Sequence, residues 1–163
     1  MEKVLQLTKK MIEYEKGCPE RVNHFLKVNA FAKIIAESEN LDNKTILIID
    51  AVTILHDVGI KVSLEKYNSS AGKYQEIEGP VIAEKMLSDL LFSEDIIARI
   101  CFLIANHHTY DKIDGMDYQI LIEADFLVNI FENNLNKDSI LKIKDKYFKT
   151  ESGTKLLEQL YST

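Results

Sequence analysis

Apolar residues recur every three or four positions along most of the chain, which is the spacing of one face of an α-helix. Only two prolines and six glycines interrupt its 163 residues, and no stretch shows the strict alternation of a half-buried strand. The pattern therefore predicts a single all-α domain, built as a helical bundle. Its helices are expected over residues 2–15, 19–38, 42–57, 79–90, 93–108 and 117–132, with one or two more over 137–161.

Residues 60–75 do not follow this helical period. The segment contains Asn-Ser-Ser at 68–70, which favours turns. It predicts a loop that leaves the end of the third helix, where Lys61, Lys73 and Tyr74 would be available to bind an anion. The alternative is a solvated connection that binds no ligand.

The third predicted helix is almost wholly apolar and ends in His56-Asp57. Helical spacing puts Ile49, Val52 and His56 on one face. Gly59 suits the position just beyond the end of a helix. A buried imidazole beside a carboxylate is costly unless a salt bridge, a hydrogen-bond network or a metal ion neutralises them.

The formal net charge of −6 makes a nucleic-acid partner unlikely, although it allows a small phosphorylated ligand held by a few basic groups. No apolar run is as long as a membrane span, and the first residues do not form a signal peptide. Cys18 and Cys101 are far apart and do not form a metal-type pair, which favours a reducing, cytoplasmic location. These features leave homo-oligomer formation open.

Four further ionisable residues occupy apolar helix faces or helix ends. His24 shares a face with Val28 in the second predicted helix, and Asp125 lies on an apolar face of the sixth. His107 and His108 end the fifth. Each alone fits a role in the core, but together with His56-Asp57 they suggest side chains that converge on a metal between facing helices. Mixed imidazole and carboxylate ligands suit divalent Fe, Mn, Zn, Co or Ni.

The order His24, His56-Asp57, Asp125 resembles the H…HD…D signature of the HD-domain superfamily of metal-dependent phosphohydrolases. The surrounding segments LHDVG, EGPVIAEKML and EADFLVN also resemble that family. The resemblance covers about residues 18–132 and implies one HD domain over residues 1–163, with the helices of 137–161 added to the family-like core.

The resemblance also implies which residues bind metal. His24, His56, Asp57 and Asp125 would hold a first ion. Asp57 would bridge to a second, which His107 and His108 would bind. Two-metal members of the family take a further histidine from the helix after the loop, and this chain has none there. Gln75 or Glu76 would replace it, or the second position is weak or empty.

The implied activity is hydrolysis of a small phosphorylated compound, with a nucleotide as the expected substrate, by water activated on one or two divalent ions. The expected catalytic residues are Asp57, His107, His108 and Lys61. The expected substrate-binding residues are Lys61, Lys73 and Tyr74. Two alternatives are a catalytically silent HD module that binds a nucleotide, and an HD-fold oxygenase that uses two irons.

Overall fold

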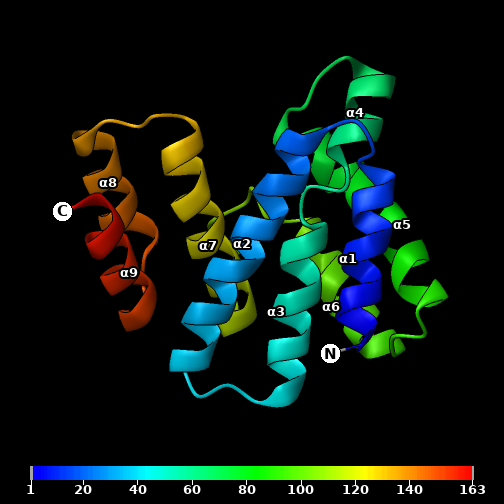
Figure 1. Cartoon of the computed structure of the whole chain (residues 1–163), viewed down its shortest axis with the longest axis horizontal. Coiled ribbons are helices and arrows are strands. Elements are labelled where there is room, and N and C mark those ends of the chain that lie inside the picture. The colour runs from blue at the N-terminus through cyan, green and yellow to red at the C-terminus, as the bar shows by residue number, and fades with distance from the viewer. Residues whose placement is uncertain (1, 163) are drawn as a thin grey trace.

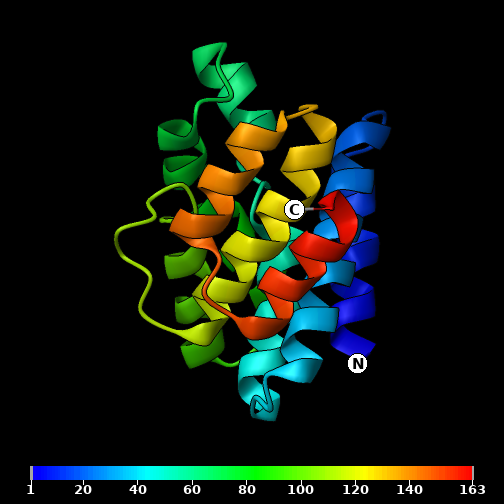
Figure 2. The same ribbon diagram turned by 90° about the vertical axis from the view of Figure 1, so that its left-hand side faces the viewer.

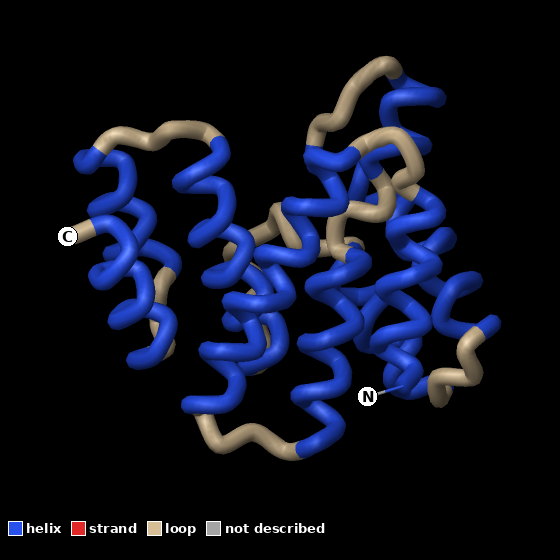
Figure 3. Tube along the Cα trace, in the orientation of Figure 1, coloured by secondary structure: helices blue, strands red, loops and turns tan. Residues whose placement is uncertain are grey.

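The computed structural model describes residues 2–162, which contain nine α-helices and no strand (Figures 1 and 3). The predicted all-α fold is therefore confirmed. None of the helices in these residues is long and apolar enough to cross a membrane. The helices are α1 (Glu2–Tyr14), α2 (Pro19–Ser38), α3 (Asn43–Leu55), α4 (Ile60–Tyr67), α5 (Gly72–Asp89), α6 (Glu94–Ile104), α7 (Met116–Glu132), α8 (Lys137–Tyr147) and α9 (Glu151–Tyr161).

Helices α2, α3 and α7 pack against one another in the middle of the molecule (Figure 1). Helices α1, α5 and α6 lie on one side of them (Figure 1), and α8 and α9 cover α7 on the other (Figure 2). One hydrophobic cluster fills the first side and a second fills the space between α2, α7 and the last two helices. The middle helices contribute to both clusters, so side chains at their ends are held by the whole bundle.

Helix boundaries follow the sequence where a capping residue or a proline marks them. Asp42 accepts hydrogen bonds from the backbone N–H groups of Lys44 and Thr45, which makes it the N-cap of α3 as expected. Pro19 opens α2, where a missing N–H costs no helical hydrogen bond. The side chains of Asn136 and Thr150 accept backbone hydrogen bonds as Asp42 does, and cap α8 and α9. The stretch over 137–161 therefore forms two helices.

The predicted loop over 60–75 is wrong for most of its length. Residues 60–67 form α4, and α5 begins at Gly72 rather than at residue 79. Helix α4 exposes most of its last turns to solvent, so it has no apolar period to detect. Contacts with α5 stabilise it instead: Lys66 and Tyr67 both donate hydrogen bonds to Glu78, at 2.6 and 2.7 Å.

Gly59 does not stand just beyond α3, which ends at Leu55, but is the N-cap of α4 with a φ of −72°. Its importance is a close approach to α5. A Cβ at Gly59 would lie 2.7 Å from the carbonyl oxygen of Gln75 and 2.9 Å from the backbone nitrogen of Gly79. Pro80, which the sequence placed at a helix start, lies inside α5.

The last two helices are joined to α7 by one buried carboxylate. Glu123 is fully buried and accepts hydrogen bonds from the backbone N–H groups of Lys149 and Thr150, between α8 and α9. Gln119 and the hydroxyl of Thr150 also donate to it. Because each donor satisfies part of the buried charge, this contact fixes α8 and α9 against the central helices.

Candidate metal centre

Four side chains from two helices and one turn meet inside the bundle. His24 comes from α2, His56 and Asp57 from the turn after α3, and Asp125 from α7. His24 Nε2 lies 3.2 Å from His56 Nε2, 3.1 Å from Asp125 Oδ1 and 3.4 Å from Asp57 Oδ2. His56 Nε2 is 3.5 Å from each of the same two oxygens. We call these four residues the first ligand group.

A second group shares Asp57 with the first. It contains Asp57, His107 and His108, whose ligand atoms lie within 4.8 Å of one another. The two histidines lie in the turn that follows α6. Oδ2 of Asp57 faces His24 and His56, whereas Oδ1 lies 3.5 Å from His107 Nε2. The two oxygens of one carboxylate thus face two different groups of imidazoles.

Hydrogen bonds at the outer side of three rings determine which nitrogen is free. Nδ1 of His56 contacts the carbonyl oxygen of Thr53 at 2.9 Å, and Nδ1 of His107 contacts that of Ile104 at 2.7 Å. Carbonyl oxygens only accept, so both Nδ1 atoms are donors and the Nε2 of a neutral ring carries a lone pair. Nδ1 of His24 likewise donates, to the carboxylate of Glu132 at 2.8 Å. Such outer partners are typical of metal-bound histidines.

These residues fit a divalent cation. Two Nε2 lone pairs 3.2 Å apart repel unless a cation or a proton lies between them, and His107 Nε2 is buried with no hydrogen-bond partner in the described chain. Ions with bonds of about 2.1 Å have neighbouring ligand atoms about 3.0–3.4 Å apart, close to the spacing in the first ligand group. Two imidazoles and two carboxylates also form a donor set that Fe, Mn, Zn, Co and Ni accept.

The pKa shifts of the site residues also favour a bound cation. Burial lowers the pKa of His24, but its hydrogen bond to Asp125 and the charge of Asp57 outweigh burial and raise it to about 9. Burial raises the pKa values of Asp57 and Asp125, yet the neighbouring histidines hold both well below the ordinary range. Both carboxylates are therefore ionised at neutral pH, and protons or a cation must balance them. Burial and the nearby His107 lower the pKa of His108 to about 4, so that ring is neutral.

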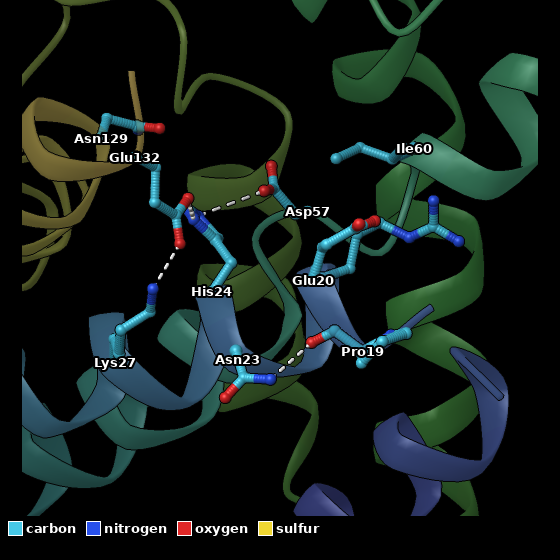
Figure 4. Close-up of a pocket in the computed structure, with 10 residues that line it drawn as sticks. Pro19, Glu20, Asn23, His24, Lys27, Asp57, Ile60, Asn129 and Glu132 are labelled. Carbon is cyan, nitrogen blue, oxygen red and sulfur yellow. Dashed lines mark hydrogen bonds and ion pairs between the residues drawn. The ribbon is translucent and has the colours of Figure 1, made fainter. Parts of the chain in front are cut away.

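A pocket of about 720 Å³ opens directly onto the first ligand group (Figure 4). His24 and Asp57 form part of its wall, and Glu132 lies between His24 and the ammonium of Lys27. Arg21 adds a second cation, bound to the buried carboxylate of Glu15 at 2.6 Å. The full lining is Pro19, Glu20, Arg21, Asn23, His24, Lys27, Asp57, Ile60, Asn129 and Glu132. We call it the centre pocket.

The three predicted anion-binding residues occupy other positions. Lys61 donates to the carbonyl oxygen of Tyr14 at 3.0 Å and lies over the Tyr14 ring. Lys73 is exposed and lies over Tyr74, which stacks on Tyr67. None of the three is among the described residues that line the centre pocket. Their roles in catalysis and substrate binding stay predictions.

Sequence reasoning missed the polar residues around the ligands. Arg21 and Lys27 lie three residues before and after His24 on α2, and Glu132 lies seven residues after Asp125 on α7. This helical spacing places each of them on the same face as a ligand, which is the signal that could have identified them. In the sequence, Glu132 marks only the end of the helix predicted over 117–132.

Comparison with known proteins identifies the family and a relative in fold. The model of the family described as HD domain matches residues 21–148, most of the chain. The chain belongs to the HD-domain family. This HD protein is similar to a crystal structure described as a predicted HD superfamily hydrolase from an uncultured Thermotogales bacterium. The two are 20% identical, with a TM-score of 0.65 over 99% of this chain and 85% of the other, a likeness of fold. A search of curated proteins found no match.

Proposed function

We propose that this HD protein is a metal-dependent phosphohydrolase that acts on a small phosphate ester. The observation that carries the proposal is the position of Asp57: its two oxygens face two ligand groups, and the residue lines the centre pocket. His24, His56, Asp57 and Asp125 would hold one ion, and Asp57, His107 and His108 would hold another. When bound, such ions lower the pKa of water and offset the charge of a phosphoryl group.

The pocket itself supplies groups that suit a phosphate ester. The guanidinium of Arg21 and the ammonium of Lys27 are the two cationic groups of the wall, which also carries the carboxylates of Glu20, Asp57 and Glu132. Buried Glu15 holds Arg21, and Glu132 holds Lys27, so both cations are oriented before a ligand arrives. Orienting charged groups in advance reduces the reorganisation that phosphoryl transfer requires.

A second hollow supports a nucleotide as the substrate. It has a volume of about 720 Å³ and lies on the His108 side of the centre. Tyr110 and Tyr147 line it, and their ring centroids are 4.8 Å apart. Lys146 lines the same hollow. Aromatic faces beside a positive charge suit a nucleobase that carries phosphate.

Phosphate release tests the proposal. The metal-free protein would be loaded separately with Mn²⁺, Fe²⁺, Co²⁺, Ni²⁺ or Zn²⁺ and assayed with nucleoside phosphates and with p-nitrophenyl phosphate. We expect turnover with at least one ion, and higher kcat/KM for a nucleotide than for the simple ester. Asp57→Ala should abolish turnover, whereas Asp145→Ala, which removes an exposed carboxylate from α8, should not.

Two results would contradict the proposal. Oxygen consumption by the iron-loaded protein without phosphate release would indicate an oxygenase. Tight nucleotide binding without turnover, with every ion tested, would indicate a silent binding module.

A further inference from the structure

Three buried atoms around the second ligand group make no hydrogen bond to any described residue. They are Nε2 of His107, Nε2 of His108 and Oε1 of Gln75. An ion held by the second group would satisfy the two nitrogens. Gln75 is only 5% exposed, and an unpaired amide oxygen in such a position costs free energy. This oxygen therefore needs an electropositive partner.

The first turns of α5, which carry Gln75, lie against both segments that supply the second group. One turn earlier on α5, a Cβ at Gly72 would lie 2.5 Å from Cδ2 of His108, so the histidine ring packs directly on that helix. On the other side, Gly59 follows Asp57 by two residues, and a Cβ there would lie 3.0 Å from the Cα of Gln75. The first turns of α5 are thus in contact with both the His108 turn and the Asp57 turn.

Local hydrogen bonds distinguish Gln75 from its neighbour Glu76. The amide nitrogen of Gln75 donates to the carbonyl oxygen of Ser70 at 2.6 Å, which leaves Oε1 as the free acceptor. Glu76 already has hydrogen-bond partners: its Oε1 accepts from the backbone N–H of His108 at 3.1 Å and from the hydroxyl of Thr109 at 3.0 Å. Glu76 therefore supports the turn that carries the histidines.

We propose that Gln75 Oε1 is a ligand of the second ion, together with Asp57, His107 and His108. The inference rests on the metal centre of the proposed function. An amide oxygen is neutral and hard, which suits Mn²⁺ better than softer ions. The first group offers two carboxylates, whereas the second offers one shared carboxylate and an amide. The second ion is consequently bound more weakly than the first and exchanges more readily.

Manganese binding by the full-length protein tests this assignment without substrate. Mn²⁺ would be titrated into metal-free wild type, Gln75→Met, Gln75→Glu and Glu76→Gln, with free Mn²⁺ measured by electron paramagnetic resonance. Wild type should bind one Mn²⁺ ion tightly and a second more weakly. Gln75→Met should lower the affinity for the more weakly bound ion by ~10-fold or more and leave the affinity for the tightly bound ion unchanged. Gln75→Glu should raise the affinity for the more weakly bound ion, because it adds a negative charge.

Glu76→Gln is the matched control, since its amide oxygen can still accept from the turn. It should leave the affinities of both ions unchanged. Unchanged binding by Gln75→Met, or loss of the second ion in Glu76→Gln instead, would overturn the assignment. If circular dichroism shows Gln75→Met to be unfolded, Gln75→Glu decides: tighter binding supports the assignment and unchanged binding overturns it. Failure of the proposed function would appear separately, as no phosphate release from protein that holds both ions.

Discussion

Individual residues at the centre are oriented by hydrogen bonds that point away from it. His56 and His107 donate to backbone carbonyl groups three residues earlier, so the peptide backbone itself determines their tautomers. His24 differs, because its Nδ1 donates to a side chain, Glu132, from another helix. Glu132 is therefore the outer partner that mutation can remove most cleanly.

Glu132→Ala should weaken binding of the first ion by ~10- to 100-fold, because the His24 ring loses its orienting partner. The hydrogen bond from His24 to Glu132 also helps to raise the pKa of His24. In the metal-free protein this pKa should therefore fall below its wild-type value of about 9. Ion affinity would be measured by isothermal titration calorimetry, and the pKa by NMR titration of the ring.

Glu20→Ala is the control for this prediction, because Glu20 lines the same pocket and is not among the described partners of His24. Glu132→Gln, which retains an oxygen acceptor, should recover part of the affinity. Equal ion affinities in Glu132→Ala and Glu20→Ala would show that Glu132 does not position His24.

Among the helices, α4 depends most on its neighbours. It has eight residues, exposes most of its last turns, and is joined to α5 through Glu78. A helix this short is marginal in isolation, so tertiary contacts must supply its stability. This dependence matters for the centre because α4 begins at Ile60, directly after the turn that carries Asp57.

The contact of α4 with α5 should be sensitive to acid. Hydrogen bonds from Lys66 and Tyr67 lower the pKa of Glu78 below its ordinary value of 4.5. A lowered pKa means that the native state favours the ionised carboxylate. The stabilisation is present above pH 4.5 and is lost as the pH falls through the lowered pKa. Glu78→Gln should therefore be less stable than wild type at pH 7, and the difference should shrink by pH 3.

Urea denaturation at both pH values measures this difference in the free energy of unfolding. Glu65→Gln, an exposed substitution on α4, serves as the reference. A difference between Glu78→Gln and wild type that stays constant from pH 7 to pH 3 would show that the charge of Glu78 does not stabilise the contact.

The same elements show what the sequence can predict. Apolar periodicity identified α2, α3 and α7, because each has a buried face and clear limits such as Pro19 and Asp42. The sequence pattern did not predict α4, because the residue that stabilises this helix, Glu78, lies eleven residues beyond its end. The start of α5 was misplaced because Pro80 is tolerated inside a helix that the Asp57 and His108 turns support on one face.

For the whole molecule, the centre lies where the two hydrophobic clusters meet on the middle helices. The order of His24, His56-Asp57 and Asp125, which resembles the family signature, indicated the four candidate ligands that the bundle brings together. Apart from His24 and Asp57, the sequence did not reveal the residues of the centre pocket. Arg21 and Lys27 look like ordinary surface charges in the sequence, because their partners Glu15 and Glu132 reach them only through the packing of the helices.

Metal content of the Mn²⁺-loaded protein, measured by elemental analysis, tests the central claim that Asp57 joins two ion positions. Wild type should hold two ions per chain. Asp125→Asn should lose mainly the first, because Asp125 faces His24 and His56. Asp57→Asn should weaken both, since each of its oxygens faces a different group. Retention of both ions by Asp57→Asn at wild-type affinity, or failure of wild type to bind any, would contradict this account.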